Sequence, residues 1–154
     1  MAAKRAENGV VCVNRRARYD YFVEESFEAG LVLVGSEVKS LREGNANLKD
    51  SYARIGKGEA FLLNAHISPY PAASGFNHEP TRTRKLLLHK REIRRLTGKV
   101  KERGLTLIPL KLYFKNGRAK VELGLARGKK VHDKRETLRR KVMQREMERS
   151  LKIR

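Results

Sequence analysis

The sequence predicts a mainly β protein: a small closed antiparallel barrel with flanking helices, followed by a basic C-terminal tail. Three observations carry this prediction. Six or seven short strand-like stretches are separated by tight-turn signals, two helical patterns interrupt them, and the C-terminal end is strongly basic with few apolar side chains. We therefore expect a disordered leader at residues 1–8, a barrel with helices at 9–127 and a tail at 128–154.

Three hairpins are predicted from turn signals between strand-like stretches. Asn-Gly at 116–117 is the strongest of these signals, Gly-Lys-Gly at 56–58 is a second and Ala-Gly at 29–30 is a third. The stretches that should pair are 18–25 with 31–34, 50–55 with 59–64, and 105–114 with 118–126. The second strand of the middle hairpin is expected to continue to Ile67, and a further short strand is expected at 10–13.

Two helices are predicted within the barrel region. One covers 36–43, where apolar residues lie three apart, and the longest covers 86–103, where apolar residues recur near the helical period before Gly104. The stretch 68–84 holds three of the four prolines and is expected to be a loop. Short antiparallel strands with interspersed helices favour an OB-like barrel, a fold that binds single-stranded or structured nucleic acid.

Charge predicts a polyanionic partner. The chain has 36 Lys and Arg against 17 Asp and Glu, a formal charge of +19. Residues 127–154 hold twelve basic and four acidic side chains, so the remainder is basic in its own right. Each cation that neutralises a phosphate releases counterions, which favours nucleic acid. No apolar run approaches the roughly 18 residues of a spanning helix, and no signal-peptide core follows Met1, so we expect a cytoplasmic protein without a membrane partner.

The tail has a narrow apolar stripe on a basic background. Its members are spaced for one side of a helix: Leu138, Val142, Met143, Met147 and Leu151. They bury too little surface to offset the entropy of ordering the tail. We therefore predict a tail that is disordered or marginally helical when free and helical against a partner.

Catalytic groups are scarce. No histidine stands at a metal-ligand spacing, and the single Cys12 excludes an internal disulfide and a cysteine-rich zinc site, so we expect no metal, cofactor or catalytic residue. His132 and Asp133, beside Lys134 and Arg135, could still serve a ribonuclease. We favour a binding cluster, in which the cations contact phosphate and Asp133 caps the tail helix. An RNA binder that recognises charge alone is a third, weaker alternative.

Two further sets could contact RNA. The basic residues of the region before and within the long predicted helix could form a phosphate-facing surface or a merely solvated face: Arg82, Arg84, Lys85, Lys90, Arg91, Arg94 and Arg95. The aromatic residues of the strand-like stretches could stack on bases or fill the core: Tyr19, Tyr21, Phe22, Phe27 and Phe61.

Six short motifs, which together span nearly the whole chain, resemble a known family. In chain order they are Asn14-Arg-Arg-Ala-Arg-Tyr-Asp-Tyr-Phe, Glu37-Val-Lys-Ser-Leu-Arg, Asn47-Leu-Lys-Asp-Ser-Tyr, Arg84-Lys-Leu-Leu-Leu-His-Lys-Arg-Glu, Pro109-Leu-Lys-Leu-Tyr-Phe-Lys-Asn-Gly and Gly128-Lys-Lys-Val-His-Asp-Lys-Arg. On these motifs the chain resembles the bacterial small protein B family, the SsrA-binding proteins.

The resemblance implies an RNA-binding adaptor rather than an enzyme. Such an adaptor binds the tRNA-like domain of transfer-messenger RNA and delivers it to stalled ribosomes in trans-translation. Its tail enters the vacant mRNA channel near the decoding centre of the small subunit. The resemblance implies no cofactor and no small-molecule substrate. The implied contacts to the tRNA-like domain are Asn14, Tyr19, Tyr21, Glu28, Leu87 and Lys120. The implied decoding-centre residues are Gly128, His132, Asp133, Lys134 and Arg135.

Overall fold

Nine strands and four helices make up the part of the chain that this computed structural model describes, residues 9–73 and 75–152. The leader predicted at 1–8 lies outside the described residues. The strands are β1 (Gly9–Val13), β2 (Tyr21–Leu31), β3 (Ala46–Asn47), β4 (Tyr52–Gly56), β5 (Glu59–Leu63), β6 (His66–Ile67), β7 (Arg84–Leu87), β8 (Thr106–Lys115) and β9 (Arg118–Gly128). The helices are α2 (Ala17–Asp20), α3 (Gly35–Arg42), α4 (Lys90–Arg103) and α5 (Val131–Lys152).

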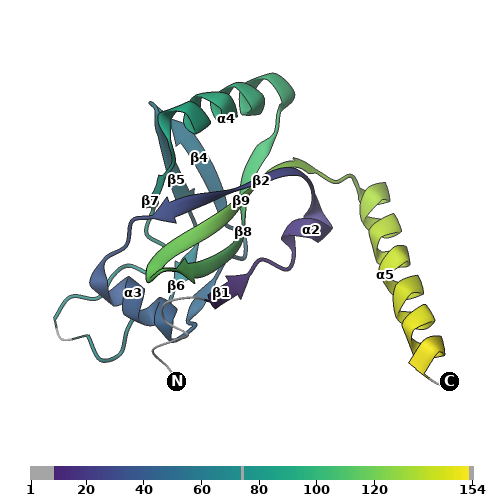
Figure 1. Cartoon of the computed structure of the whole chain (residues 1–154), viewed down its shortest axis with the longest axis horizontal. Coiled ribbons are helices and arrows are strands. Elements are labelled where there is room, and N and C mark those ends of the chain that lie inside the picture. Colours follow the sequence, from purple (N-terminus) through teal and green to yellow (C-terminus); the bar gives the residue numbers. More distant parts are fainter. Residues whose placement is uncertain (1–8, 74, 153–154) are drawn as a thin grey trace.

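Six antiparallel strands close into a ring, which confirms the predicted barrel (Figure 1). The ring runs β8-β4-β5-β7-β2-β9, and β9 pairs back with β8 along nearly its whole length. Strand β1 pairs with the C-terminal half of β8, beyond the residue that pairs with β4, while β3 and β6 form a separate small sheet. Closure leaves the six ring strands with paired edges, so the barrel is a rigid platform for side chains on its outer surface.

Aliphatic side chains fill the barrel. Several of the most deeply buried lie on β5, β8 and β9, among them Leu62, Leu112, Val121 and Leu123, each no more than 1% exposed. Cys12 packs at the edge of this core, and burial raises the pKa of its thiol to about 11. The thiol is therefore protonated at neutral pH, as expected of a small core residue rather than a nucleophile.

Two of the three predicted hairpins are confirmed, and both have turns that demand positive φ. The two-residue turn at 57–58 joins β4 to β5 with φ of 52° and 74°, and the turn at 116–117 joins β8 to β9 with φ of 51° and 75°. Type I′ turns of this kind match the twist of the strands they join. Strand β5 ends at Leu63 instead of continuing to Ile67, because Asn64 adopts φ of 62° and Ile67 pairs with β3.

The hairpin predicted around Ala29-Gly30 is wrong. Strand β2 runs without a turn from Tyr21 to Leu31, and the residues before it form the short helix α2. Gly30 lies inside the strand, where it pairs with Leu87 on one side and with Lys120 on the other. A Cβ added to Gly30 would lie 3.1 Å from the Leu87 Cβ. This glycine therefore allows close packing of β2 against β7 and is not a turn residue.

The long helix predicted at 86–103 begins later, at Lys90. Residues 84–87 form strand β7, in which Leu86 points into the core and is 1% exposed. Glu92 stabilises the new start by accepting a hydrogen bond from the His89 backbone N–H at 3.3 Å. The helix ends, as predicted, where Gly104 adopts φ of 63°. It lies across one end of the barrel (Figure 1), while α3 begins and ends one residue earlier than predicted.

A buried ion pair joins α3 to β7. The Arg84 guanidinium is fully buried and donates to the Glu37 carboxylate and to the carbonyls of Ala65 and Pro80, at 2.7 and 3.0 Å. Arg82 donates to the same carboxylate. Burial raises the pKa of Glu37, but these hydrogen bonds and the one from the Val34 N–H more than offset it, so the pKa lies below its ordinary value.

Burial and ion pairs therefore remove part of the predicted basic surface. Arg84 is buried, Lys85 pairs with Glu59 at 3.5 Å, and Arg95 pairs with Glu25. Three cations of the set remain exposed on α4, and no ion pair is seen for them among the described residues: Lys90, Arg91 and Arg94. The acidic partners lie on elements that are distant in the sequence, α3, β5 and β2, so the local spacing of charges could not reveal them.

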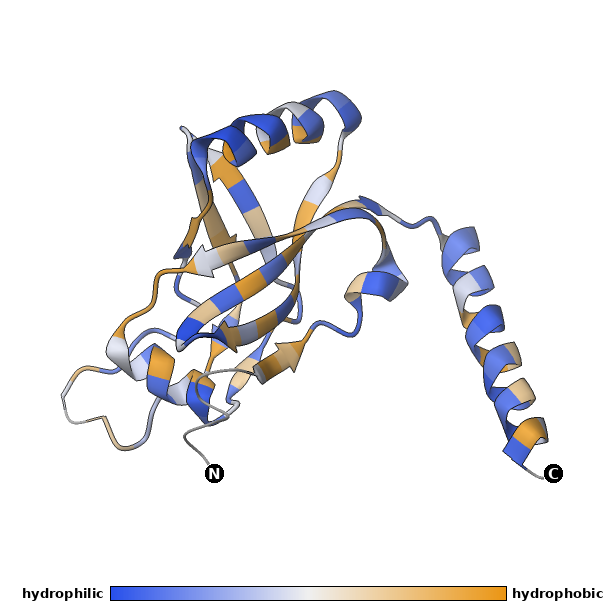
Figure 2. Cartoon of the chain, viewed as in Figure 1, coloured by the Kyte–Doolittle hydropathy of each residue, from blue (hydrophilic) through white to orange (hydrophobic). Residues whose placement is uncertain are grey.

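The tail forms the helix α5, which extends away from the barrel (Figure 1). Most of its residues are hydrophilic, with a few apolar positions along the helix (Figure 2). The apolar stripe predicted from the spacing is exposed, from 47% at Leu138 to 73% at Leu151. Within the described ranges, no helix is both long enough and apolar enough to span a membrane.

Candidate nucleic-acid interface

Three of the predicted RNA contacts come together from three strands. Glu28 of β2, Leu87 of β7 and Lys120 of β9 line one cavity of about 380 Å³. The pairing of the strands explains this, because Gly30 lies between Leu87 and Lys120 and Glu28 is two residues away on the same face. The cavity combines a carboxylate, an ammonium group and an apolar side chain that is 55% exposed.

The Glu28 carboxylate is held by cations and by a tyrosine. The Tyr113 hydroxyl donates to Glu28, and the Lys115 Nζ lies 3.6 Å from it. The Tyr113 hydrogen bond and the charges of Lys115 and Lys120 place the pKa of Glu28 below its ordinary value. Burial and the neighbouring carboxylate raise the pKa of Tyr113, so its hydroxyl remains a donor. An ionised carboxylate in this setting accepts hydrogen bonds from a base or a 2′-OH, while the lysines attract phosphate.

Tyr113 was not predicted as part of a site, although the sequence contains a signal for its position. The turn at Asn116-Gly117 sets the register of β8 against β9, and that register places Tyr113 directly opposite Lys120. Lys111 extends the same surface, with its Nζ 5.3 Å from the centre of the Tyr113 ring. Lys111, Tyr113 and Glu28 line a second cavity of about 490 Å³ beside the first.

Replacing Tyr113 by Phe is expected to weaken binding of structured RNA about threefold to tenfold, since one hydrogen bond contributes about 0.5–1.5 kcal/mol. Loss of the donor also raises the pKa of Glu28 toward that of a free carboxyl, so the defect should grow as the pH falls toward 5. NMR titration of the Glu28 carboxyl and anisotropy titration with RNA measure the two effects. Tyr70→Phe, outside the cavities described in this subsection, is the control, and an unchanged pKa of Glu28 in Tyr113→Phe would contradict the assignment.

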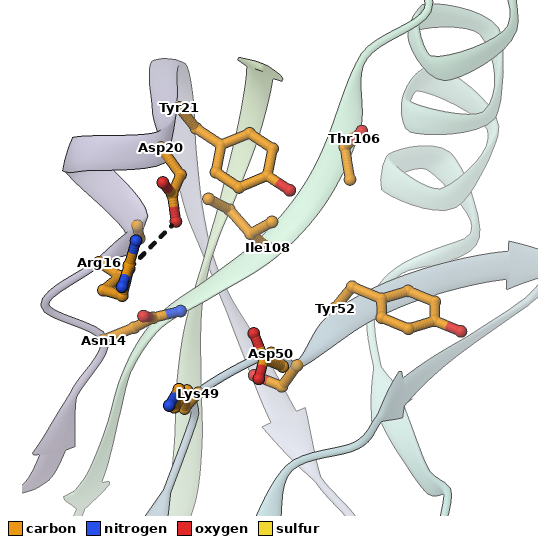
Figure 3. Close-up of a pocket in the computed structure, with 11 residues that line it drawn as sticks. Asn14, Arg16, Asp20, Tyr21, Lys49, Asp50, Tyr52, Thr106 and Ile108 are labelled. Carbon is orange, nitrogen blue, oxygen red and sulfur yellow. Dashed lines mark ion pairs between the residues drawn. The ribbon is translucent and has the colours of Figure 1, made fainter. Parts of the chain in front are cut away.

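Two more predicted contacts line a cavity at the other end of β2. Asn14 and Tyr21 border a space of about 460 Å³ between α2 and the start of β4 (Figure 3). The Asn14 Nδ2 donates to the Pro109 carbonyl at 2.9 Å, so this side chain also ties β1 to β8. The cavity adds residues that sequence reasoning did not place in a site: Arg16, Asp20, Lys49, Asp50, Tyr52 and Thr106.

Tyr19, the last of the predicted contacts to the tRNA-like domain, lies where the tail leaves the barrel. Arg16 and Lys134 both lie over its ring, each 5.7 Å from the centre. The neighbouring Phe22 ring has Arg127 and Lys129 over it, at 5.0 and 4.8 Å. Cations near aromatic faces are attracted by the ring quadrupole. The structure thus places Tyr19, a predicted contact to the tRNA-like domain, against Lys134, a predicted decoding-centre residue.

The predicted decoding-centre residues do not form one cluster. Gly128 ends β9 opposite Tyr21, and the Lys134 Nζ pairs with Asp20 at 3.1 Å, facing the head. His132 and Arg135 face solvent, and the His132 Nε2 lies 3.9 Å from the Glu136 Oε1.

The predicted capping position of Asp133 is wrong by three residues. Helix α5 already begins at Val131, so Lys130 stands at the N-cap and Asp133 lies in the first turn. There its Oδ2 accepts a hydrogen bond from the Lys130 N–H at 3.2 Å. The carboxylate still stabilises the helix start, but as the third helical residue.

The geometry suits binding through charge, hydrogen bonds and aromatic faces. Among residues 9–73 and 75–152, no three His, Cys, Asp or Glu side chains are grouped so that they could hold a metal ion. The cavities present carboxylates and lysines beside a half-buried tyrosine and an exposed leucine, groups that can contact phosphates, bases and 2′-OH groups.

Comparisons with known proteins agree across nearly the whole chain. The model of the SmpB protein family matches residues 11–153. A similar relative from Geobacillus thermodenitrificans, named SsrA-binding protein, is 60% identical over 150 residues, 97% of each chain. An SsrA-binding protein from Syntrophobacter fumaroxidans is 64% identical over 145 residues, covering 94% of this chain and 90% of its own. A solved structure described as "tmRNA-SmpB: a journey to the center of the bacterial ribosome" is 55% identical with a TM-score of 0.68, covering 84% of this chain and 94% of its own.

Proposed function

Because the chain belongs to the SmpB protein family, we propose that it is an RNA-binding adaptor of trans-translation in the cytoplasm. The barrel, residues 9–127, binds the tRNA-like domain of transfer-messenger RNA. The tail, residues 128–154, enters the vacant mRNA channel of a stalled ribosome near the decoding centre. The protein brings the RNA to the ribosome and breaks no bond itself.

The convergence of Glu28, Leu87 and Lys120 in one cavity is the observation that supports this proposal most. A surface that recognised charge alone would need no carboxylate, because a carboxylate repels phosphate. Glu28 is ionised, held by Tyr113 and flanked by lysines, so it can accept from a base or a 2′-OH at one fixed position. Selectivity for one folded RNA follows from such a fixed acceptor.

The tail suits a channel lined by RNA. It is a helix of 22 residues, about 33 Å long at 1.5 Å per residue. Its basic side chains surround an exposed apolar stripe, so phosphates can be neutralised around the helix while the stripe meets bases or protein. Neither property is needed to hold the tRNA-like domain, which supports a separate target for the tail.

The proposed binding of the tRNA-like domain by the barrel is tested by Glu28→Gln and Lys120→Met. Each change removes a charge-assisted contact of about 1.5–3 kcal/mol, so affinity for the tRNA-like domain should fall by about tenfold or more. Glu59→Gln and Lys85→Met are matched controls, since these residues form an exposed ion pair outside both cavities. Equal losses in the controls, or equal losses with an unrelated structured RNA, would favour the charge-only binder.

A further inference from the structure

We propose that Asp20 is a positioning residue for the tail: it docks the first turns of α5 on α2 and so sets the direction in which the tail leaves the barrel. The effect of this docking on tagging rests on the proposed function, in which the barrel and the tail bind separate targets. The docking itself rests only on contacts within the chain.

The C-terminal end of α2 receives two lysines from the tail region. The Asp20 side chain pairs with the Lys134 Nζ at 3.1 Å, and the Asp20 carbonyl accepts from the Lys129 N–H at 2.8 Å. The Lys129 Nζ donates to the Arg18 carbonyl at 2.9 Å. Cations at a helix C-terminus satisfy the free carbonyls there and complement the helix dipole. Arg16 completes the cluster 3.6 Å from the Asp20 carboxylate.

The same lysines also hold the tail helix against rotation. The Lys129 Nζ donates to the Thr137 Oγ1 at 2.9 Å, and that hydroxyl donates to the Asp133 carbonyl at 3.0 Å. Lys134 and Thr137 lie three apart, on one side of α5. Two contacts on one side of the helix, tied to one end of α2, resist both tilt and rotation about the helix axis. A single contact would permit pivoting.

The contacts of Lys129 and Lys134 with α2 form a joint between the barrel and the tail. This joint controls the whole tail because the rest of α5 lies free of the barrel. Every residue from Leu138 to Lys152 is exposed. About 22 Å of helix extends beyond Thr137, so a change of about 30° at the joint displaces its end by about 11 Å. That displacement exceeds the diameter of a helix backbone, so the joint decides whether the tail and the barrel can reach their targets together.

The joint also touches the head site. Lys134 lies over the Tyr19 ring, and Asp20 lines the cavity bordered by Asn14 and Tyr21. The residue that anchors the tail therefore sits between the predicted RNA contacts and the tail. Asp20 pairs with Lys134 there and keeps it beside α2.

Asp20→Asn tests the docking directly, with Glu24→Gln as the matched control, since Glu24 makes an ion pair with Arg103 on another element. Spin labels at Arg54→Cys and Gln144→Cys, in a Cys12→Ser background, report the distance between β4 and α5. The distance distribution should widen by at least about twofold in Asp20→Asn and stay unchanged in Glu24→Gln. An unchanged distribution in Asp20→Asn would overturn the docking.

A reconstituted tagging reaction with unlabelled protein tests the functional consequence. Asp20→Asn should lower tagging about tenfold, while Asp20→Glu, which keeps the ion pair, should restore it. Because Asp20 lines the cavity bordered by Asn14 and Tyr21, affinity for the tRNA-like domain is titrated separately, and tagging is measured with that RNA at a saturating concentration. A broad distribution with normal tagging would overturn the positioning role, and a large loss of RNA affinity would assign Asp20 to the RNA site instead. Failure of the wild-type chain to support tagging would instead contradict the proposed function, and leave the docking to be judged by the label distances.

Discussion

Replacing Asp133, Lys134 and Arg135 together by alanine is expected to abolish tagging on stalled ribosomes. Affinity for the tRNA-like domain should fall by no more than about threefold, because the cavity of Glu28, Leu87 and Lys120 is left intact and only Lys134 touches a predicted RNA contact, Tyr19. The loss has two causes: the exposed Arg135 side chain no longer meets phosphate, and Lys134 no longer docks on Asp20. Single-turnover tagging and anisotropy titration measure the two quantities separately.

The matched control changes the same charges farther along the helix. Glu148, Arg149 and Lys152 also comprise one acid and two bases, and all three are exposed. Their replacement by alanine should lower tagging far less than the first triple change. If the two triple variants were equally impaired, tagging would depend on total tail charge and not on the residues at its base.

Replacing Glu37 by alanine is expected to have the largest effect on stability. The change leaves the fully buried Arg84 guanidinium without its carboxylate, and breaking a buried pair from one side costs about 3–5 kcal/mol. That is a large share of the roughly 5–15 kcal/mol that stabilises a domain. Urea unfolding followed by circular dichroism measures it. Glu59→Ala, at an exposed ion pair, should cost less than about 1 kcal/mol, and similar losses in both variants would contradict the assignment.

The pH dependence of the free energy of unfolding provides a second measurement of the role of Glu37. The pKa of Glu37 is lower in the folded chain than in the unfolded chain, so its ionisation stabilises the fold above the unfolded value of about 4.3. That contribution is lost as the pH falls through the lowered pKa. The free energy of unfolding should therefore decline more steeply on acidification in wild type than in Glu37→Ala. Equal slopes would show that this carboxylate has no perturbed pKa.

Elements were predictable from sequence where the information is local. The turn at Asn116-Gly117 needs positive φ at two successive residues, and these residues adopt it readily, so the hairpin follows. Gly30 gives the same local signal for a different reason, because β7 packs closely against it. Leu86 and its leucine neighbours suit a helix or a strand equally well, and only pairing with β5 and β2 decides for the strand.

Charged residues were the least predictable, since their partners are distant in sequence. Arg84 belongs to a basic stretch that suggests a surface, yet its carboxylate lies 47 residues away on α3. Tyr113 could have been found by counting outward from the 116–117 turn to Lys120. The contact of Asp20 with Lys134 had no such signal, because it depends on where α5 lies after β9 ends.

The central claim is that the barrel alone recognises one folded RNA and the tail serves a second target. A competition titration of the tRNA-like domain against ordinary tRNA tests it most directly, using the full chain and a chain ending at Arg127 at near-physiological salt. We expect both chains to prefer the tRNA-like domain to the same extent. Loss of binding in the shortened chain, or no preference in either, would contradict the claim and favour recognition by charge alone.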